Sequence, residues 1–354
     1  MTMSSPHRHV MGIRRPNRIF IVLALLMCGR ALLAQDPTLR FGGQIPPDVD
    51  TIYERGLAWL ASAQDPTGGW KSGGETGAGV DGICLMAFLA SGEDPNYGKY
   101  AGNIHRAVAA IIQQQDATTG YIQNSMYHHG FAMLALSEAY GAVDESLFVK
   151  PNRSIAEALK LAIGCAATAQ KNNRWGGWRY NPNGSDADTS VTGAVLMGLL
   201  AARNAGMDVP DDVINNAMEY MRRSTGADGS VAYTGGFGGL NGSMNLTAVS
   251  ALTGAVSKSK NTDQYKAAIK RLQDNMENTD ARQAGSYAEY YRYYMAQALF
   301  QGDYASWQKW NGEQVRELRD LQHDDGSFNN GAYSTGMSLL AMALNYRFLP
   351  IYER

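Results

Sequence analysis

A motif that recurs at the spacing of a helical hairpin constrains this chain more than any other feature of its sequence. Its first copy runs from Arg55 to Trp70 and contains a Gly, an aromatic-Leu pair, a Gln and then Gly-Gly-Trp. Its last copy keeps the same frame from Leu318 through Gln322 to Phe328. Self-similarity at a fixed period is the signature of repeat architectures, in which each repeat is one supersecondary unit. We therefore expect a series of similar units.

Six turns carry this motif or its equivalent, and each lies between an amphipathic helix and a more apolar one. The residues that mark the turns are spaced 41 to 57 residues apart: Trp70, Tyr121, Trp178, Val231, Tyr287 and Phe328. The Gln at the end of the first helix can bond the unpaired carbonyls of that helix terminus, while the aromatic folds back over it. The motif thus predicts six stapled hairpins, with Trp70, Trp178 and Phe328 in the scaffold.

The two helices of each predicted hairpin differ in where their apolar residues fall. Second helices such as 82–89, 191–200 and 335–344 are apolar on nearly every side, which is typical of a helix that is buried all round. First helices such as 265–272 and 315–321 alternate charged and apolar positions at helical spacing. Two concentric layers satisfy both patterns. Since the sequence carries no convincing strand pattern, the predicted class is all-α.

The first 34 residues predict the secretory signal of an exported bacterial protein. They hold five arginines and no acid, with an apolar run from Ile19 to Cys28 and then Ala34 before a polar stretch. We expect cleavage after Ala34, a short linker over 35–49, a toroid domain over 50–354, and export to the periplasm or beyond the cell. The apolar run is too short for a bilayer core of about 30 Å. We therefore expect no membrane span after cleavage, with an uncleaved anchor as the alternative.

The charge of the predicted mature chain argues against a nucleic-acid partner. Beyond Ala34, 26 basic residues stand against 33 acidic ones, a net charge of −7. Binding to nucleic acid favours a basic stripe instead.

Two cysteines, Cys84 and Cys165, remain after the predicted cleavage, each in an apolar helical run. A free Cys behaves as a small hydrophobe, so we expect two buried thiols. One disulfide is the alternative in an oxidising compartment.

The first copy of the motif resembles, residue for residue, the QW repeat of triterpene cyclases. The segments 127–130, 175–180 and 348–354 are similar to exported, single-ring members of the prenyltransferase and squalene oxidase repeat family, over a region from about Asp50 to the C-terminus. The resemblance implies an α/α toroid of six inner and six outer helices, with a central cavity open at the inner-helix N-termini. Squalene-hopene cyclases have two such barrels and act on a membrane triterpene from the cytoplasmic face. A single barrel and an export signal both point away from that activity.

In such a ring the turns before the inner helices converge at one open end of the ring, which we call the mouth. Residues that are remote in sequence come together there. The two candidate catalytic residues are Asp186 and Asp188. The candidate binding residues are polar or aromatic: Asp81, Tyr127, His128, His129, Asn245, Glu289, Tyr290, Arg292 and Tyr333. Helix N-termini favour carboxylates, so each acid is alternatively a helix cap. The tyrosines of 287–294 could cup an apolar ligand, stack sugars or pack the ring.

The segment Ser185 to Ser190 resembles the acid motif of class II terpene cyclases, Asp-x-Asp-Asp-Thr-Ala, whose middle Asp protonates an alkene or epoxide. If Asp188 matches the last Asp of that motif, Ala187 occupies the position of the proton donor, and the donor is missing. Sliding the alignment by one residue makes Asp188 the donor but places Thr189 where a supporting Asp belongs.

Protein prenyltransferases share this fold and bind zinc through an Asp, a Cys two residues later and a distant His. Here Cys84 follows Asp81 by three residues, with His128 or His129 in the next hairpin. All three residue types can ligate zinc. Because the spacing is altered and Cys84 lies in an apolar run, we expect no metal and no other cofactor.

Three functions remain open at this point. The first is a non-enzymatic toroid that binds a hydrophobic, isoprenoid-like ligand or another protein. The second is a glycosidase or polysaccharide lyase of the (α/α)6 class, acting on a glycan with two of Asp186, Asp188 and Glu289 as acid and base. The third is terpene cyclisation or isoprenoid transfer, which rests on fold alone.

Overall fold

The computed structural model describes Met1 and residues 45–148, 151–234, 243–277, 287–346 and 348–352. Apart from Met1, the predicted signal peptide and its cleavage site lie outside these residues. By its contacts the chain divides into one unit that ends at Ile45 and another that runs from Pro46 to Arg354. In the described part of the chain, no helix is both long and apolar enough to cross a membrane.

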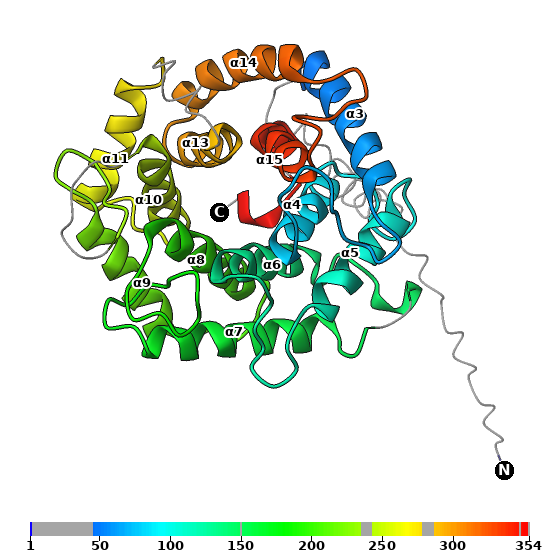
Figure 1. Cartoon of the computed structure of the whole chain (residues 1–354), viewed down its shortest axis with the longest axis horizontal. Helices are drawn as coiled ribbons and strands as arrows, with labels where there is room; N and C mark the ends of the chain where they lie inside the picture. Colours follow the sequence, from blue (N-terminus) through cyan, green and yellow to red (C-terminus); the bar gives the residue numbers. More distant parts are fainter. Residues whose placement is uncertain (2–44, 149–150, 235–242, 278–286, 347, 353–354) are drawn as a thin grey trace. The chain divides into compact units, whose positions relative to one another are not determined.

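The unit that begins at Pro46 is all-α, as predicted. Its described residues form twelve α-helices and only isolated β-bridges. Six helices form the outer layer (Figure 1): α3 (Pro47–Ala63), α5 (Ala101–Gln113), α7 (Ile155–Lys171), α9 (Asp211–Ser224), α11 (Asp263–Asp274) and α14 (Tyr304–Leu321).

Six further helices alternate with these along the chain and form the inner layer (Figure 1): α4 (Ala78–Leu89), α6 (Met126–Ala139), α8 (Thr189–Asn204), α10 (Met244–Val256), α13 (Ala288–Gly302) and α15 (Ala332–Met342). Each inner helix packs against the next, and α15 packs against α4, so the inner layer closes into a ring. In this order α6 and α13 stand three places apart in both directions. They therefore lie opposite each other across the ring.

Burial separates the two layers as the sequence pattern predicts. All twelve residues of α4 are buried, whereas α9 buries one stripe that includes Val213, Ala217 and Tyr220 and leaves its charged face exposed. A helix enclosed by neighbours on every side must be apolar on every side, and an outer helix needs one apolar stripe only.

The repeated motif staples neighbouring hairpins, although not through the predicted carbonyls. Gln64 donates from Nε2 to the carbonyl of Gly68 in its own turn and to that of Asn103 in the next outer helix, at 2.9 Å each. Gln322 repeats the pattern on Gly326 and on Ile52 of α3, so it joins the last hairpin to the first. The prediction that Gln bonds its own helix terminus was wrong for Gln64 and Gln322, because their amides reach sideways to the next hairpin, whereas Gln114 does bond the Ala110 carbonyl of its own helix.

The turn aromatics belong to the scaffold, as expected. Trp70 and Trp178 are each 1% exposed, and their indole N–H groups donate to carbonyls of the preceding outer helix, those of Leu60 at 2.8 Å and Ala166 at 2.9 Å. Phe328 is also buried. Beside them, Gly68 has φ +92°, and a Cβ there would meet the Arg106 carbonyl oxygen at 2.2 Å. Only glycine fits this close approach of two hairpins.

Residues 348–352 lie at one end of the ring. The 3₁₀ turn η4 (Pro350–Tyr352) lies among the inner helices and packs against α8 (Figure 1). Leu349 and Ile351 are buried, and the Ile351 N–H lies 3.5 Å from a carboxylate oxygen of Glu138, near the C-terminal end of α6. The inner-helix N-termini therefore form the opposite end, where the candidate site is expected.

Candidate functional site

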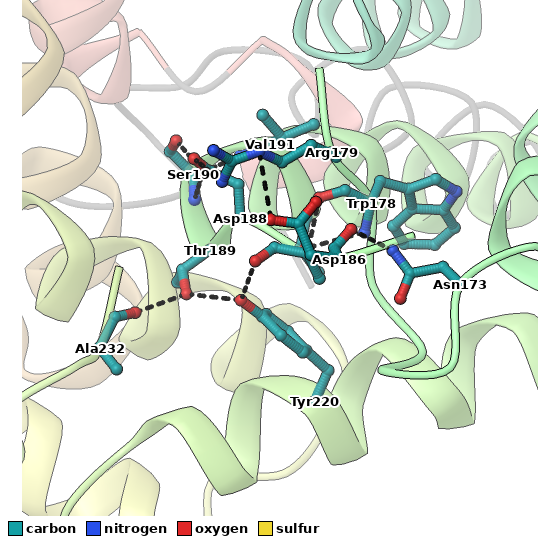
Figure 2. Close-up of polar contacts among 12 residues, drawn as sticks. Asn173, Trp178, Arg179, Asp186, Asp188, Thr189, Ser190, Val191, Tyr220 and Ala232 are labelled. Atoms are coloured by element: carbon teal, nitrogen blue, oxygen red, sulfur yellow. Dashed lines mark hydrogen bonds and ion pairs between the residues drawn. The ribbon is translucent and has the colours of Figure 1, made fainter. Parts of the chain in front are cut away.

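The turn that leads into α8 holds both candidate acids, and it is fixed from both sides. The backbone N–H of Asp188 donates to the Trp178 carbonyl at 2.9 Å, and that of Thr189 donates to the Tyr233 carbonyl at 3.0 Å. The Thr189 hydroxyl bonds the Ala232 carbonyl at 2.7 Å and lies 3.1 Å from the Tyr220 hydroxyl. Figure 2 shows the Thr189 hydroxyl between Ala232 and Tyr220, and these contacts hold the turn in one place before any ligand arrives.

Asp188 is the N-cap of α8 and is fully buried. Its Oδ1 accepts hydrogen bonds from the backbone N–H groups of Ser190 at 2.8 Å and Val191 at 3.1 Å, and from the Ser190 hydroxyl. Its Oδ2 lies 3.5 Å from a guanidinium nitrogen of Arg179. Every one of these groups donates to the carboxylate, so both of its oxygens serve as acceptors here.

Arg179 links the two acids (Figure 2). Its Nε lies 3.7 Å from Oδ2 of Asp186, whose side chain is 55% exposed. The same guanidinium lies over the rings of Tyr180 and Tyr233, at 5.9 Å from each centroid. Burial, and to a lesser degree hydrogen bonding to Asp188, raises the pKa of Tyr233. The mouth thus combines the exposed carboxylate of Asp186, one cation and two exposed tyrosines, with the Asp188 carboxylate buried beside them.

Aromatic rings from opposite sides of the ring meet at its centre. Tyr127 of α6 lies 6.2 Å from Tyr290 of α13, and Phe131 of α6 lies 6.0 Å from Tyr293 of α13, measured between centroids. Tyr294 packs on Tyr290 at 4.6 Å. Since α6 and α13 face each other across the ring, these side chains span its middle in the first two turns of the inner helices. At this level the centre of the ring is occupied by these aromatic side chains, which we call the tyrosine layer.

The hydroxyls of this layer are neutral. Burial raises the pKa of Tyr127, Tyr290 and Tyr294 well above the usual value, and neighbouring tyrosines add to the effect. Tyr333 of α15 belongs to the same group, because its hydroxyl is close enough to that of Tyr127 to influence its pKa. The Tyr290 hydroxyl is buried and has no hydrogen-bond partner within the described part of the chain. A ligand oxygen could supply that partner.

Two predicted binding residues, Asp81 and His129, point toward the turns rather than the mouth. Asp81 accepts from the Trp70 N–H at 2.9 Å and from the Gln114 amide at 2.8 Å, and burial raises its pKa to about 6. His129 accepts from the Ile122 N–H on Nδ1 at 3.1 Å and has its Nε2 3.1 Å from the Ala162 carbonyl.

Both residues occupy the fourth position of their inner helix. Thr192 and Thr335 occupy the same position in α8 and α15, and their hydroxyls accept from the N–H groups of Trp178 and Phe328. The repeat therefore places one acceptor here to receive the turn N–H, and Asp81 and His129 perform this task in the first two hairpins.

The four remaining candidate binding residues lie in different surroundings. His128 accepts from the Gly79 N–H on Nδ1 at 3.1 Å, between α6 and α4, and burial lowers its pKa. Arg292 points outward and pairs with Glu317 of α14 at 2.6 Å. Glu289 is 8% exposed and accepts from the Asn329 amide at 2.5 Å. Asn245 lies partly exposed in the first turn of α10.

The structure does not bring Asp81, Cys84 and His128 together as zinc ligands. The Cys84 thiol faces the Ala332 carbonyl at 3.6 Å, and burial raises its pKa well above the usual value. Both Asp81 oxygens already accept hydrogen bonds, one from the Trp70 N–H and one from the Gln114 amide. No group of three or more His, Cys, Asp or Glu side chains in the described ranges is placed to hold a metal. Cys84 and Cys165 are both free and buried.

Sequence reasoning missed Arg179, Tyr180 and Tyr233 as parts of the site. A signal for the first two was present, because an Arg-Tyr pair directly follows the turn tryptophan Trp178. The Tyr180 carbonyl accepts from the Met126 N–H at 2.8 Å, which ties this pair to the start of α6.

Comparison with known proteins supports the fold. No family model and no curated protein matches the chain. Among solved structures, an alpha-1,6-mannanase from Salegentibacter sp. HEL1_6 has a TM-score of 0.62 at 8% identity, covering 83% of this chain and 98% of its own. The type II terpene cyclase MstE from Scytonema, in its apo form, has a TM-score of 0.55 at 14% identity, covering 85% and 99%. A variant of that cyclase in complex with geranylgeranyl dihydroxybenzoate gives 0.56 at 14%, covering 85% and 98%. The chain therefore has the α/α-toroid fold of both enzymes.

Proposed function

We propose that this protein is an exported toroid that binds an apolar, isoprenoid-like ligand at its mouth and does not cyclise it. The observation that carries the proposal is the tyrosine layer formed by Tyr127, Tyr290, Tyr294 and Tyr333 at the start of three inner helices. Its ring faces offer apolar contact, and its hydroxyls offer hydrogen bonds to an oxygen at one end of the ligand.

The surroundings of Asp188 argue against a proton donor at this mouth. Alkene protonation requires a carboxyl group that presents its proton to the substrate. The two oxygens of Asp188 instead accept from backbone N–H groups, the Ser190 hydroxyl and Arg179. Ala187, the residue at the donor position of the resembling motif, is fully buried, and a Cβ on Gly177 would lie 3.0 Å from its side chain. It packs into the turn and does not line the mouth.

Titration calorimetry with farnesol, a neutral isoprenoid alcohol, tests the proposal. The chain from Gln35 onward should bind it saturably, and Tyr333→Ala should weaken binding by about tenfold, because an aromatic side chain contributes roughly 1.5–3 kcal/mol when fully buried. Tyr97→Ala is the matched control, since Tyr97 is 78% exposed and precedes α5, outside the tyrosine layer. Absence of saturable binding, or equal binding by the Tyr333 variant with an unchanged melting curve, would contradict the proposal.

A glycan-active site is the second candidate, and a specific observation favours it. Asp186 is exposed beside Asp188, and exposed tyrosines flank the pair at positions 180 and 233. Most glycosidases use a pair of carboxyl groups, and exposed tyrosine rings offer flat apolar faces. The mannanase of the same fold suggests alpha-1,6-mannan oligosaccharides as the first substrate. Release of shorter oligosaccharides by the wild type, lost in Asp186→Asn, would favour this candidate over the first.

A further inference from the structure

A second candidate site lies on the outer layer, at the turn between α7 and α8. A groove of about 290 Å³ is lined by residues of the α7 end, the turn itself and α9. Its charged members are Lys171, Arg174 and Arg223, with Asp212 as the single acid. Trp175 lines it as well and lies under Arg174, whose guanidinium is 5.3 Å from the ring centroid.

The cations of this groove are largely unpaired. In the ranges that the structure describes, neither Lys171 nor Arg174 has a carboxylate within ion-pair distance. Arg223 lies 3.6 Å from Glu219, but that carboxylate is already held by two hydrogen bonds of 2.7 Å from Arg222. The groove therefore keeps a positive field although the predicted mature chain carries a net charge of −7.

The polar floor of the groove is preformed. Gln170 donates to the carbonyls of Gly176 and Val213 at 2.8 Å each, and Arg223 donates to the Trp175 carbonyl at 3.0 Å. Asn173 accepts from the Trp175 N–H at 2.8 Å through its side-chain oxygen. These bonds hold the turn against α9, so its cations project from a fixed backbone.

The corresponding turn carries an Asp in four other hairpins that the structure describes. Asp65, Asp116, Asp228 and Asp325 each accept from the backbone N–H two residues later, at 2.7 to 3.0 Å. Asn173 makes this bond in the α7 turn and is followed by Arg174. The α7 turn thus keeps this side-chain bond to the backbone with a neutral Asn and adds the positive charge of Arg174 beside it. The scaffold itself does not require that charge.

We propose that this groove binds the anionic group of a small molecule, a carboxylate, sulfate or phosphate. The two unpaired cations attract the anion, and the guanidinium of Arg174 provides the planar donor edge that suits such oxyanions. The exposed part of Trp175 gives a flat surface for the remainder of the ligand. This site does not depend on the function proposed for the mouth.

Titration calorimetry at low ionic strength with glucuronate, inorganic sulfate and inorganic phosphate tests the proposal and separates the three sources of negative charge. Neutral glucose is the ligand control. At least one anion should bind with a stoichiometry of one and weaken as salt is added. Lys171→Glu and Arg174→Glu should each weaken it by about tenfold, since reversing a unit charge a few ångströms away changes the attraction by roughly that factor in water.

Lys160→Glu is the matched variant, because Lys160 is exposed on the same helix but does not line the groove. It should bind as the wild type does. The proposal is overturned if none of the anions binds saturably, or if Lys160→Glu weakens binding as much as Arg174→Glu, which would indicate a response to net charge only.

Discussion

Replacing His129 by Gln tests whether this residue belongs to the scaffold or to the mouth. Burial lowers the pKa of His129 from 6.5 to about 4, and the ring is fully enclosed between the Ile122 N–H and the Ala162 carbonyl. The unfolded chain therefore binds a proton on this ring at a higher pH than the folded chain does. The stability that depends on the neutral ring is present above pH 6.5 and is lost as the pH falls toward 4.

The size of this effect follows from the two pKa values. With 6.5 for the unfolded ring and about 4 for the folded one, lowering the pH to 5 costs the fold about 2 kcal/mol. A Gln side chain can accept and donate the same two hydrogen bonds but does not titrate. Hence the wild type should exceed His129→Gln in free energy of unfolding by about 2 kcal/mol more at pH 7 than at pH 5.

Urea unfolding of both proteins at the two pH values gives this double difference directly. Asp81→Asn is an informative companion, because burial raises the pKa of Asp81 to about 6 and its contribution has the opposite sign. The difference between wild type and Asp81→Asn should shift by about 1 kcal/mol in favour of the wild type as the pH falls from 7 to 5. A gap between wild type and His129→Gln that does not depend on pH would refute the buried, neutral ring and return His129 to the mouth.

Three further predictions follow from single contacts. Asp188→Ala should lower the free energy of unfolding by about 0.5–2 kcal/mol, because a helix cap is lost, and Asp188→Asn should lower it by less. Urea unfolding measures both values, and equal losses would contradict the capping role. Trp178→Phe should lower the free energy of unfolding by about 1–3 kcal/mol, because the Ala166 carbonyl loses its indole donor. A melting temperature equal to that of the wild type would argue against a stabilising role of this hydrogen bond. Dithiothreitol should leave the melting temperature unchanged, since Cys84 and Cys165 are free; a fall would reveal a disulfide.

The fold was accessible from the sequence because its two governing patterns are local. The Gln-to-aromatic spacing that ends at Trp70 and Phe328 marks the first and last hairpins, and the contrast between helices such as α4 and α9 assigns the inner and outer layers. Both patterns can be counted along the chain without knowing which helices meet. The partners of Gln64 could not be predicted in this way, because the Asn103 carbonyl belongs to the next hairpin.

The site was less accessible because it depends on helix rotation and on contacts across the ring. One residue along an α-helix rotates the side chain by about 100°. That rotation separates His128, at the boundary of α6 and α4, from His129, which faces the turn. The meeting of Tyr127 with Tyr290 depends on α6 and α13 being opposite, which the closed ring determines and no local pattern indicates.

Product analysis by mass spectrometry tests the central claim, that this toroid holds its ligand without protonating it. The purified protein is incubated with squalene and, separately, with geranylgeranyl dihydroxybenzoate, the substrate of the cyclase that shares its fold. Because both oxygens of Asp188 accept hydrogen bonds or face Arg179, both compounds should be recovered unchanged. A cyclic product formed by the wild type and absent with Asp188→Asn would contradict the account and identify Asp188 as the acid.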